Sequence, residues 1–215
     1  SAGGEKLFLV DDRGYLLQNI TACAALADMA LRDAPGSEIA IPLNMPNLFE
    51  EIAKRHQGKI IRTEIDLDTL IKATCPKNVI MAGDGQGNFI FPDFHCAVDG
   101  MMALAKTLEF LATQHVSLGE IVANLPPYHL AERKVSCVWE AKARVMRLIH
   151  QKFEKYEFHL INGVKVPLSP TKWVLIVPDP DQPYFRITAE AETQDEAEGL
   201  VDEYAQIVEN ISPLE

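Results

Sequence analysis

In the first half of the chain, apolar runs of strand length alternate with segments whose apolar residues have helical spacing. Strands are expected at 38–43, 59–63 and 78–82, with a helix in each interval. This order is typical of a parallel α/β sheet, because each helix carries the chain back across the sheet before the next parallel strand begins. Asn47 and Glu50 have the spacing of a cap for the first of these helices.

Shorter elements are expected on both sides of this alternation. In chain order they are a hairpin over 6–17 with its turn at 11–14, a helix over 19–31, a loop over 83–88, a strand over 89–91, a long helix after Asp99, and a short helix with a capping box at Ser117 and Glu120. The abrupt start at residues 1–4 favours a chain cut from a longer one.

Pro126 and Pro127 cannot continue a helix, so a domain boundary and an extended exit are expected between Leu125 and Lys134. The elements expected beyond it are a helix over 138–156, strands at 158–161 with 164–168, at 173–177 and at 184–190, and a last helix capped by Thr193 and Glu196. The fold class is therefore α/β: a mixed, mostly parallel α/β/α domain, followed by a small α+β domain with an antiparallel sheet flanked by helices. The division expected is 1–36, 37–126 and 127–215.

The charge balance limits the partners. Twenty Lys and Arg face 31 Asp and Glu, a net charge of −11, which repels a phosphodiester backbone and argues against nucleic acid. No apolar run approaches the roughly 18 residues of a membrane span, and no signal peptide precedes the first strand, so no membrane partner and a cytoplasmic location are expected. The four cysteines are scattered and are expected to be buried free thiols.

The loop at 83–88 is the first candidate for chemistry. A glycine-rich phosphate cradle needs a helix after it, and here a strand follows. The loop lies instead at the carboxyl end of a sheet strand, where α/β sheets bind ligands, and its Asp84, Gln86 and Asn88 suit sugar hydroxyls. A solvated turn, whose glycines serve only the backbone, is the alternative.

The loop at 177–183 is the second candidate. It contains three prolines, two carboxylates and an amide but no cation, so it is expected to attract a metal or a basic partner and to repel phosphate. The alternative is a plain solvated loop. The basic residues between 133 and 155 are interspersed with glutamates and are interpreted as a solvated helix face, and neither a histidine metal pair nor a catalytic triad is visible.

Several short motifs follow one another along nearly the whole chain. They are Leu7-Phe-Leu-Val-Asp11, the loop Gly83–Asn88, Asp99-Gly100, Ser117-Leu-Gly-Glu120, the exit at Pro126, Trp173-Val-Leu175, the loop with Pro178 and Pro183, and Arg186 to Glu192. Their order resembles the C-terminal half of the phosphohexomutase superfamily, the phosphoglucomutases and phosphomannomutases. The resemblance implies the end of the family's second domain, then its third and fourth.

The resemblance also implies a metal loop, a sugar loop and a phosphate loop. At the metal loop the aligned residues are Ser1, Gly3 and Glu5, so at most one of the family's three carboxylates remains, and the magnesium expected for the family is not expected here. At the sugar loop, Asp84, Gln86 and Asn88 replace the family's Glu, Ser and His. Some hydroxyl recognition is expected to survive there.

The phosphate loop departs furthest. The family's Arg, Ser and Thr become Val177, Asp179 and Asp181, so a cation and two hydroxyls are replaced by an apolar side chain and two anions. At an effective dielectric of about 20, like charges about 4 Å apart repel by roughly 4 kcal/mol, so phosphate is expected to be rejected. The family's phosphoserine lies in its first domain, outside this sequence. No catalytic residue, cofactor or metal ligand is therefore assigned, and the chain alone is expected to be inactive.

These departures predict a catalytically degenerate mutase-like module with a structural or sugar-sensing role. The resemblance further implies attachment to a sugar-1-phosphate nucleotidyltransferase of the mannose-1-phosphate guanylyltransferase type. The expected partners are a weakly bound hexose or hexose phosphate and the upstream domains of the same parent chain. Two alternatives stay open: part of an active phosphohexomutase that interconverts hexose 1- and 6-phosphates, and an interaction domain that uses the acidic C-terminal face.

Overall fold

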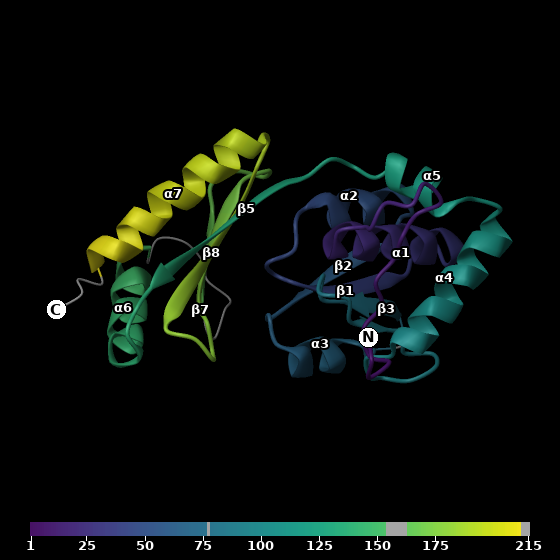
Figure 1. The fold of residues 1–215 in the computed structure, drawn as a ribbon, viewed down its shortest axis with the longest axis horizontal. Coiled ribbons are helices and arrows are strands. Elements are labelled where there is room, and N and C mark those ends of the chain that lie inside the picture. The colour runs from purple at the N-terminus through teal and green to yellow at the C-terminus, as the bar shows by residue number, and fades with distance from the viewer. Residues whose placement is uncertain (77, 154–162, 212–215) are drawn as a thin grey trace. The chain divides into compact units, whose positions relative to one another are not determined.

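The computed structural model describes residues 1–76, 78–153 and 163–211. The chain divides into two compact units, Ser1–Pro127 and Tyr128–Glu215 (Figure 1). Each has its own sheet, and the two sheets confirm the predicted fold class. The division predicted at residue 36 stays a prediction.

The sheet of the first unit has the strand order β2-β1-β3-β4. The parallel strands β1 (Glu38–Pro42), β2 (Lys59–Thr63) and β3 (Val79–Gly83) are those that the alternation predicts, and β4 (Phe89–Ile90) runs antiparallel to β3. Four of the five residues of β1 are buried, as expected for a strand covered on both faces.

Among the described residues of this unit, five helices flank the sheet. They are α1 (Asn19–Asp33), α2 (Leu48–Arg55), α3 (Leu67–Ala73), α4 (Gly100–Gln114) and α5 (Leu118–Ala123). Helices α1 and α2 lie on one face and α3 on the other (Figure 1). Leu70 of α3 packs against Ala40 of β1 and Ala82 of β3, and ten consecutive residues of α1, from Ala22 to Leu31, are buried.

One local prediction for this unit is wrong. Asn47 has helical backbone angles and makes no side-chain cap bond, since its backbone carbonyl accepts the Glu50 amide at 3.0 Å, and the Glu50 carboxylate binds the Arg62 guanidinium at 2.7 Å. The predicted hairpin over 6–17 is present, with an antiparallel bridge between Val10 and Leu16 and the Leu17 amide donating to the Leu9 carbonyl at 2.9 Å, although the run at 6–10 forms no regular strand. The capping box at Ser117 and Glu120 is confirmed.

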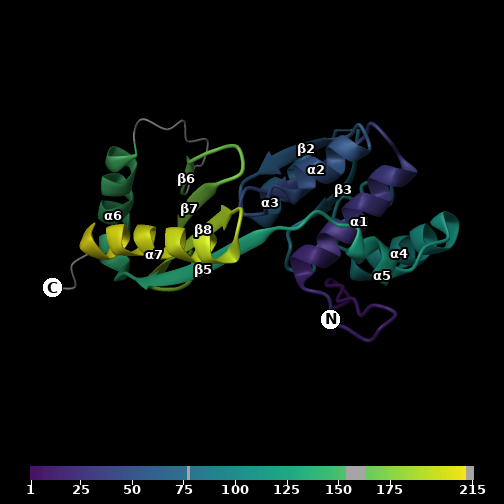
Figure 2. The ribbon, with the colours of Figure 1, turned by 90° about the horizontal axis from the view of Figure 1, so that it is seen from above.

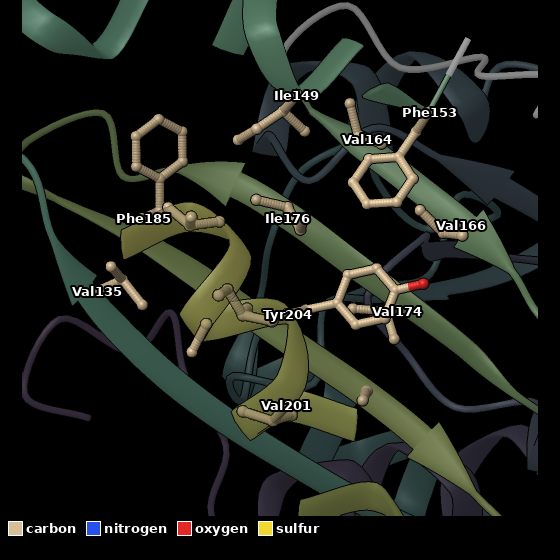
Figure 3. Packing of buried hydrophobic residues seen from close by; sticks show 14 of the residues in the cluster. Val135, Ile149, Phe153, Val164, Val166, Val174, Ile176, Phe185, Val201 and Tyr204 are labelled. Atoms are coloured by element: carbon tan, nitrogen blue, oxygen red, sulfur yellow. The ribbon is translucent and has the colours of Figure 1, made fainter. Parts of the chain in front are cut away.

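The described residues of the second unit form an antiparallel sheet in the order β5-β8-β7-β6 and two helices. Its elements are β5 (His129–Ser136), α6 (Trp139–Lys152), β6 (Val164–Pro167), β7 (Trp173–Pro178), β8 (Tyr184–Ala191) and α7 (Gln194–Ile211). Seen from above, β5 runs beside β8 along α7 (Figure 2). Side chains from the sheet and from both helices form one core, in which the rings of Phe153 and Tyr204 stack with centroids 5.5 Å apart (Figure 3).

The strand β5 corrects the sequence analysis. The segment predicted as an extended exit pairs with β8 over its full length, from His129 opposite Ala191 to Ser136 opposite Tyr184. Its charged middle is exposed, and of its eight residues only Val135 is fully buried, so the strand has little apolar signal. The strand predicted at 158–161 lies outside the described residues.

Two smaller findings complete the fold. Cys23 and Cys137 are buried free thiols as predicted, but Cys75 and Cys96 are exposed, so the prediction is wrong for those two. None of the helices within the described ranges is long and apolar enough to cross a bilayer.

Candidate functional site

The first candidate is the glycine loop, residues 83–88, which joins β3 to β4 at the carboxyl edge of the parallel strands. Gly85 and Gly87 have φ angles of +67° and +92°, a region that residues with a Cβ rarely adopt. At Gly83 a Cβ would come within 2.6 Å of the Cys23 sulfur on α1. Glycines are therefore required for the turn itself and for its close packing on α1.

The predicted sugar-binding residues are brought together, but two of them bind the loop itself. The Asp84 carboxylate accepts the backbone amides of Gln86 at 2.7 Å and Asn88 at 3.2 Å, and also the Asn88 side-chain amide at 2.6 Å. Gln86 is exposed. The freely presented polar group of this loop is therefore the Gln86 amide, and the Asp84–Asn88 pair shapes the turn beneath it.

Cys23 lies under this loop. Burial, with a further contribution from the nearby Asp84 charge, raises the pKa of its thiol to about 12. The thiol therefore stays protonated at neutral pH and is a poor nucleophile, since the thiolate is the reactive form.

The adjacent edge of the sheet contributes two residues that the sequence analysis missed. Arg62, on β2, donates to the carbonyl oxygens of Pro42, Met45 and Pro46, and so fixes the segment that follows β1. In that segment the Asn44 Oδ1 atom is buried and has no hydrogen-bond partner within the described part of the chain. The only signal for Asn44 was its position after a parallel strand.

The second candidate is the proline loop, residues 177–183, between β7 and β8. Lys142 of α6, which is 9 % exposed, donates to the main-chain carbonyls of Asp179 at 2.6 Å and of Gln182. Its ammonium also lies 3.8 Å from the centroid of the Trp139 ring. The interpretation of the basic residues as a solvated face is therefore wrong for Lys142, which is buried and holds the loop.

Asp179 is the best-bound side chain of this loop. Its Oδ1 atom accepts the Asp181 amide at 3.0 Å, its Oδ2 atom accepts the Arg186 guanidinium at 3.1 Å, and the Tyr184 hydroxyl donates to the same carboxylate. Burial raises the pKa of this carboxyl, but hydrogen bonds from the three donors outweigh burial and hold the pKa below its usual range. Asp179 is therefore ionised at neutral pH.

Arg186 is the cation that the loop's own sequence lacks. It lies on β8 and pairs with Asp179 and, at 3.0 Å, with Glu132 on β5. The loop composition alone could not reveal this, because both partners of Arg186 are set by strand pairing and by the turn. Both carboxylates offset its charge.

The residues aligned with the family's metal loop do not fit a magnesium ion. The Ser1 hydroxyl accepts the Lys6 amide at 3.1 Å, Gly3 has no side chain, and only Glu5 supplies a carboxylate. Magnesium requires near-octahedral oxygen coordination, commonly with carboxylates. Across the residues that the structure describes, no group of three His, Cys, Asp or Glu side chains is placed to hold a metal ion.

Comparison with known proteins identifies the family. Residues 19–128, just over half of the chain, match the family described as phosphoglucomutase/phosphomannomutase, alpha/beta/alpha domain III. A probable phosphoglucosamine mutase of Methanopyrus kandleri is 27% identical over 206 residues, which are 95% of this chain and 45% of that protein. A phosphoglucomutase/phosphomannomutase of Thermococcus kodakarensis is 28% identical over 194 residues, which are 90% of this chain and 42% of that protein.

Solved structures show the same fold. A phosphoglucomutase/phosphomannomutase family protein of Burkholderia thailandensis superposes with a TM-score of 0.78 at 17% identity, covering 98% of this chain and 45% of that one. The chain thus spans less than half the length of these relatives. The match of residues 19–128, together with the two sheets, shows that the chain belongs to the phosphoglucomutase/phosphomannomutase family.

Proposed function

We propose that the chain is a catalytically degenerate module of a larger sugar-phosphate-metabolising protein, with a structural or hexose-sensing role. The single observation that carries the proposal is the state of Arg186, the cation beside the proline loop. Its guanidinium is already paired with Asp179 and Glu132, and the loop itself has neither a hydroxyl side chain nor a cationic one. A dianionic phosphate that approaches Arg186 is repelled by the Asp179 carboxylate, which already occupies the position beside the guanidinium.

The hexose-sensing role rests on the glycine loop. Gln86 is exposed, and the carboxylate and amide of Asp84 and Asn88 retain hydrogen-bonding capacity beyond the bonds within the loop. Neutral hydroxyls suit such groups, so the expected ligand is a hexose bound weakly through its hydroxyls.

An NMR titration with mannose, mannose 1-phosphate and glucose 1-phosphate tests this role. We expect amide shifts at residues 84–88 with millimolar ligand, similar for mannose and its phosphate, and none at residues 177–183. Gln86→Ala should weaken the response, whereas Gln182→Ala, an amide removed from the other loop, should leave it unchanged. If residues 84–88 do not respond, the hexose-sensing role is wrong and only the structural role remains. Saturable shifts at residues 177–183 with the sugar phosphates would contradict the proposed loss of phosphate binding.

We also propose attachment to a sugar-1-phosphate nucleotidyltransferase of the mannose-1-phosphate guanylyltransferase type. This proposal rests on the family resemblance alone. The assay is release of pyrophosphate by the full-length protein from GTP and mannose 1-phosphate. If the full-length protein lacks that activity, the proposed attachment is wrong.

The second candidate function is that the chain forms part of an active phosphohexomutase. It is favoured by the names of the two relatives described above, both mutases, which the chain matches over 90% or more of its length. Conversion of a hexose 1-phosphate to the 6-phosphate by the full-length protein decides between the two. An active protein that loses its activity when Arg186 is replaced by Gln supports the mutase.

A further inference from the structure

We propose that Arg186, the Tyr184 hydroxyl and the Asp181 amide form an oxyanion site, which the chain fills with its own Asp179 carboxylate. The inference rests on the proposed function and deepens it. It explains why the proline loop is closed to an external anion and identifies the side chain that closes it.

Three donors converge on one carboxylate, two of them from strand β8 and one from the loop. The Arg186 guanidinium comes from β8, the Asp181 amide from the loop, and the Tyr184 hydroxyl from the first residue of β8. Guanidinium, hydroxyl and main-chain amide are the donors with which proteins hold carboxylates and phosphates. The Asp179 side chain is only 11 % exposed, so it occupies the site and is not merely close to it.

The loop backbone around the site is held by contacts that do not involve the Asp179 carboxylate. Lys142 binds two main-chain carbonyls of the loop, and the Asp179 amide donates to the Tyr184 carbonyl at 3.0 Å. The loop backbone therefore has its own anchors. Removing the Asp179 side chain should empty the site without releasing the turn.

Removing this side chain also changes the local charge. Three cations, Lys134, Lys142 and Arg186, lie in or beside the loop, and three carboxylates, Glu132, Asp179 and Asp181, offset them. Glu132 binds the NH1 atom of Arg186, and Asp179 binds the NH2 atom. Without Asp179 the NH2 atom loses its carboxylate partner and keeps only the long contact of 3.5 Å to the Tyr184 hydroxyl. The local charge then becomes positive, which favours a tetrahedral oxyanion.

The test is titration of Asp179→Ala with inorganic phosphate, followed by calorimetry and by the NMR signals of the Arg186 side chain. We expect Asp179→Ala to bind phosphate at least about tenfold more tightly than the unaltered protein, a change of about 1.4 kcal/mol. Asp179→Ala combined with Arg186→Gln should lose the gain. Asp181→Ala is the matched control, since it removes the same charge from the same loop but keeps the backbone amide, and it should gain less than about twofold.

Each other outcome is decisive. An equal gain in Asp181→Ala means that overall charge controls binding, and the site is rejected. No gain in a folded Asp179→Ala also rejects it, yet leaves the degenerate module intact, because the unaltered protein still binds no phosphate. Tight phosphate binding by the unaltered protein at this loop overturns the proposed function itself. If Asp179→Ala does not fold, Asp179→Asn replaces it, with a smaller gain expected because the amide still fills the site.

Discussion

Two cations in this protein hold loops by their main-chain carbonyls. Arg62 binds three carbonyls after β1, and Lys142 binds two in the proline loop. Hydrogen bonds from a charged donor are stronger than neutral ones. At the scale of single residues, Arg62 fixes the segment that follows β1, and Lys142 fixes the proline loop.

Replacing Arg62 with Met should destabilise the first unit by about 2 to 3 kcal/mol, because three carbonyls lose a charged donor. Urea unfolding followed by circular dichroism measures the change. Arg55→Met is the control, since Arg55 donates to a single carbonyl, that of Asn124, in an exposed position, and the change should cost less than about 1 kcal/mol. Equal costs for the two variants contradict the role given to Arg62.

At the scale of elements, helix α3 depends on its cap. The Asp66 side chain accepts the Thr69 hydroxyl at 2.6 Å and the Thr69 amide at 2.7 Å, and these bonds lower the pKa of the carboxyl. Leu70 of this helix covers one face of the sheet. The cap therefore stabilises a helix on which part of the first core depends.

Asp66→Ala should cost about 1 kcal/mol at neutral pH, as measured for other cap residues. Because the folded-state pKa is lowered, the cap stabilises the fold above the ordinary aspartate pKa near 4, and this stability is lost as pH falls through the lowered value. The cost of Asp66→Ala should therefore shrink as the pH falls below about 4. Asp68→Ala, an exposed carboxylate in the same first turn, is the control and should cost less at every pH.

At the scale of the whole molecule, the chain has two units with separate cores. Ile176 of β7 is fully buried in the second core. Ile176→Ala should destabilise the second unit by about 2 to 4 kcal/mol. Hydrogen exchange should accelerate at β7 amides and stay unchanged at β1 amides. Equal acceleration in both strands means that the two units unfold as one.

The sequence predicted the parts of the molecule that have a regular pattern. Strands β1 and β2 were predictable because runs of neighbouring residues are apolar, whereas β5 was missed because its middle, Glu132 to Lys134, is charged and exposed at the edge of the sheet. The glycine loop was predictable because its residues are adjacent in the sequence. The partners of Asp179 were not, because strand pairing and helix packing bring Arg186 and Lys142 to it from outside the loop.

The distribution of the thiols gives the protein a pair of chemical probes. Cys23 is buried in the first unit and Cys137 in the second, while Cys75 and Cys96 are exposed. Once the two exposed cysteines are exchanged for serine, a thiol reagent reaches either remaining sulfur only when its own unit opens. Labelling rates then report the opening of each half separately, with no added fluorophore.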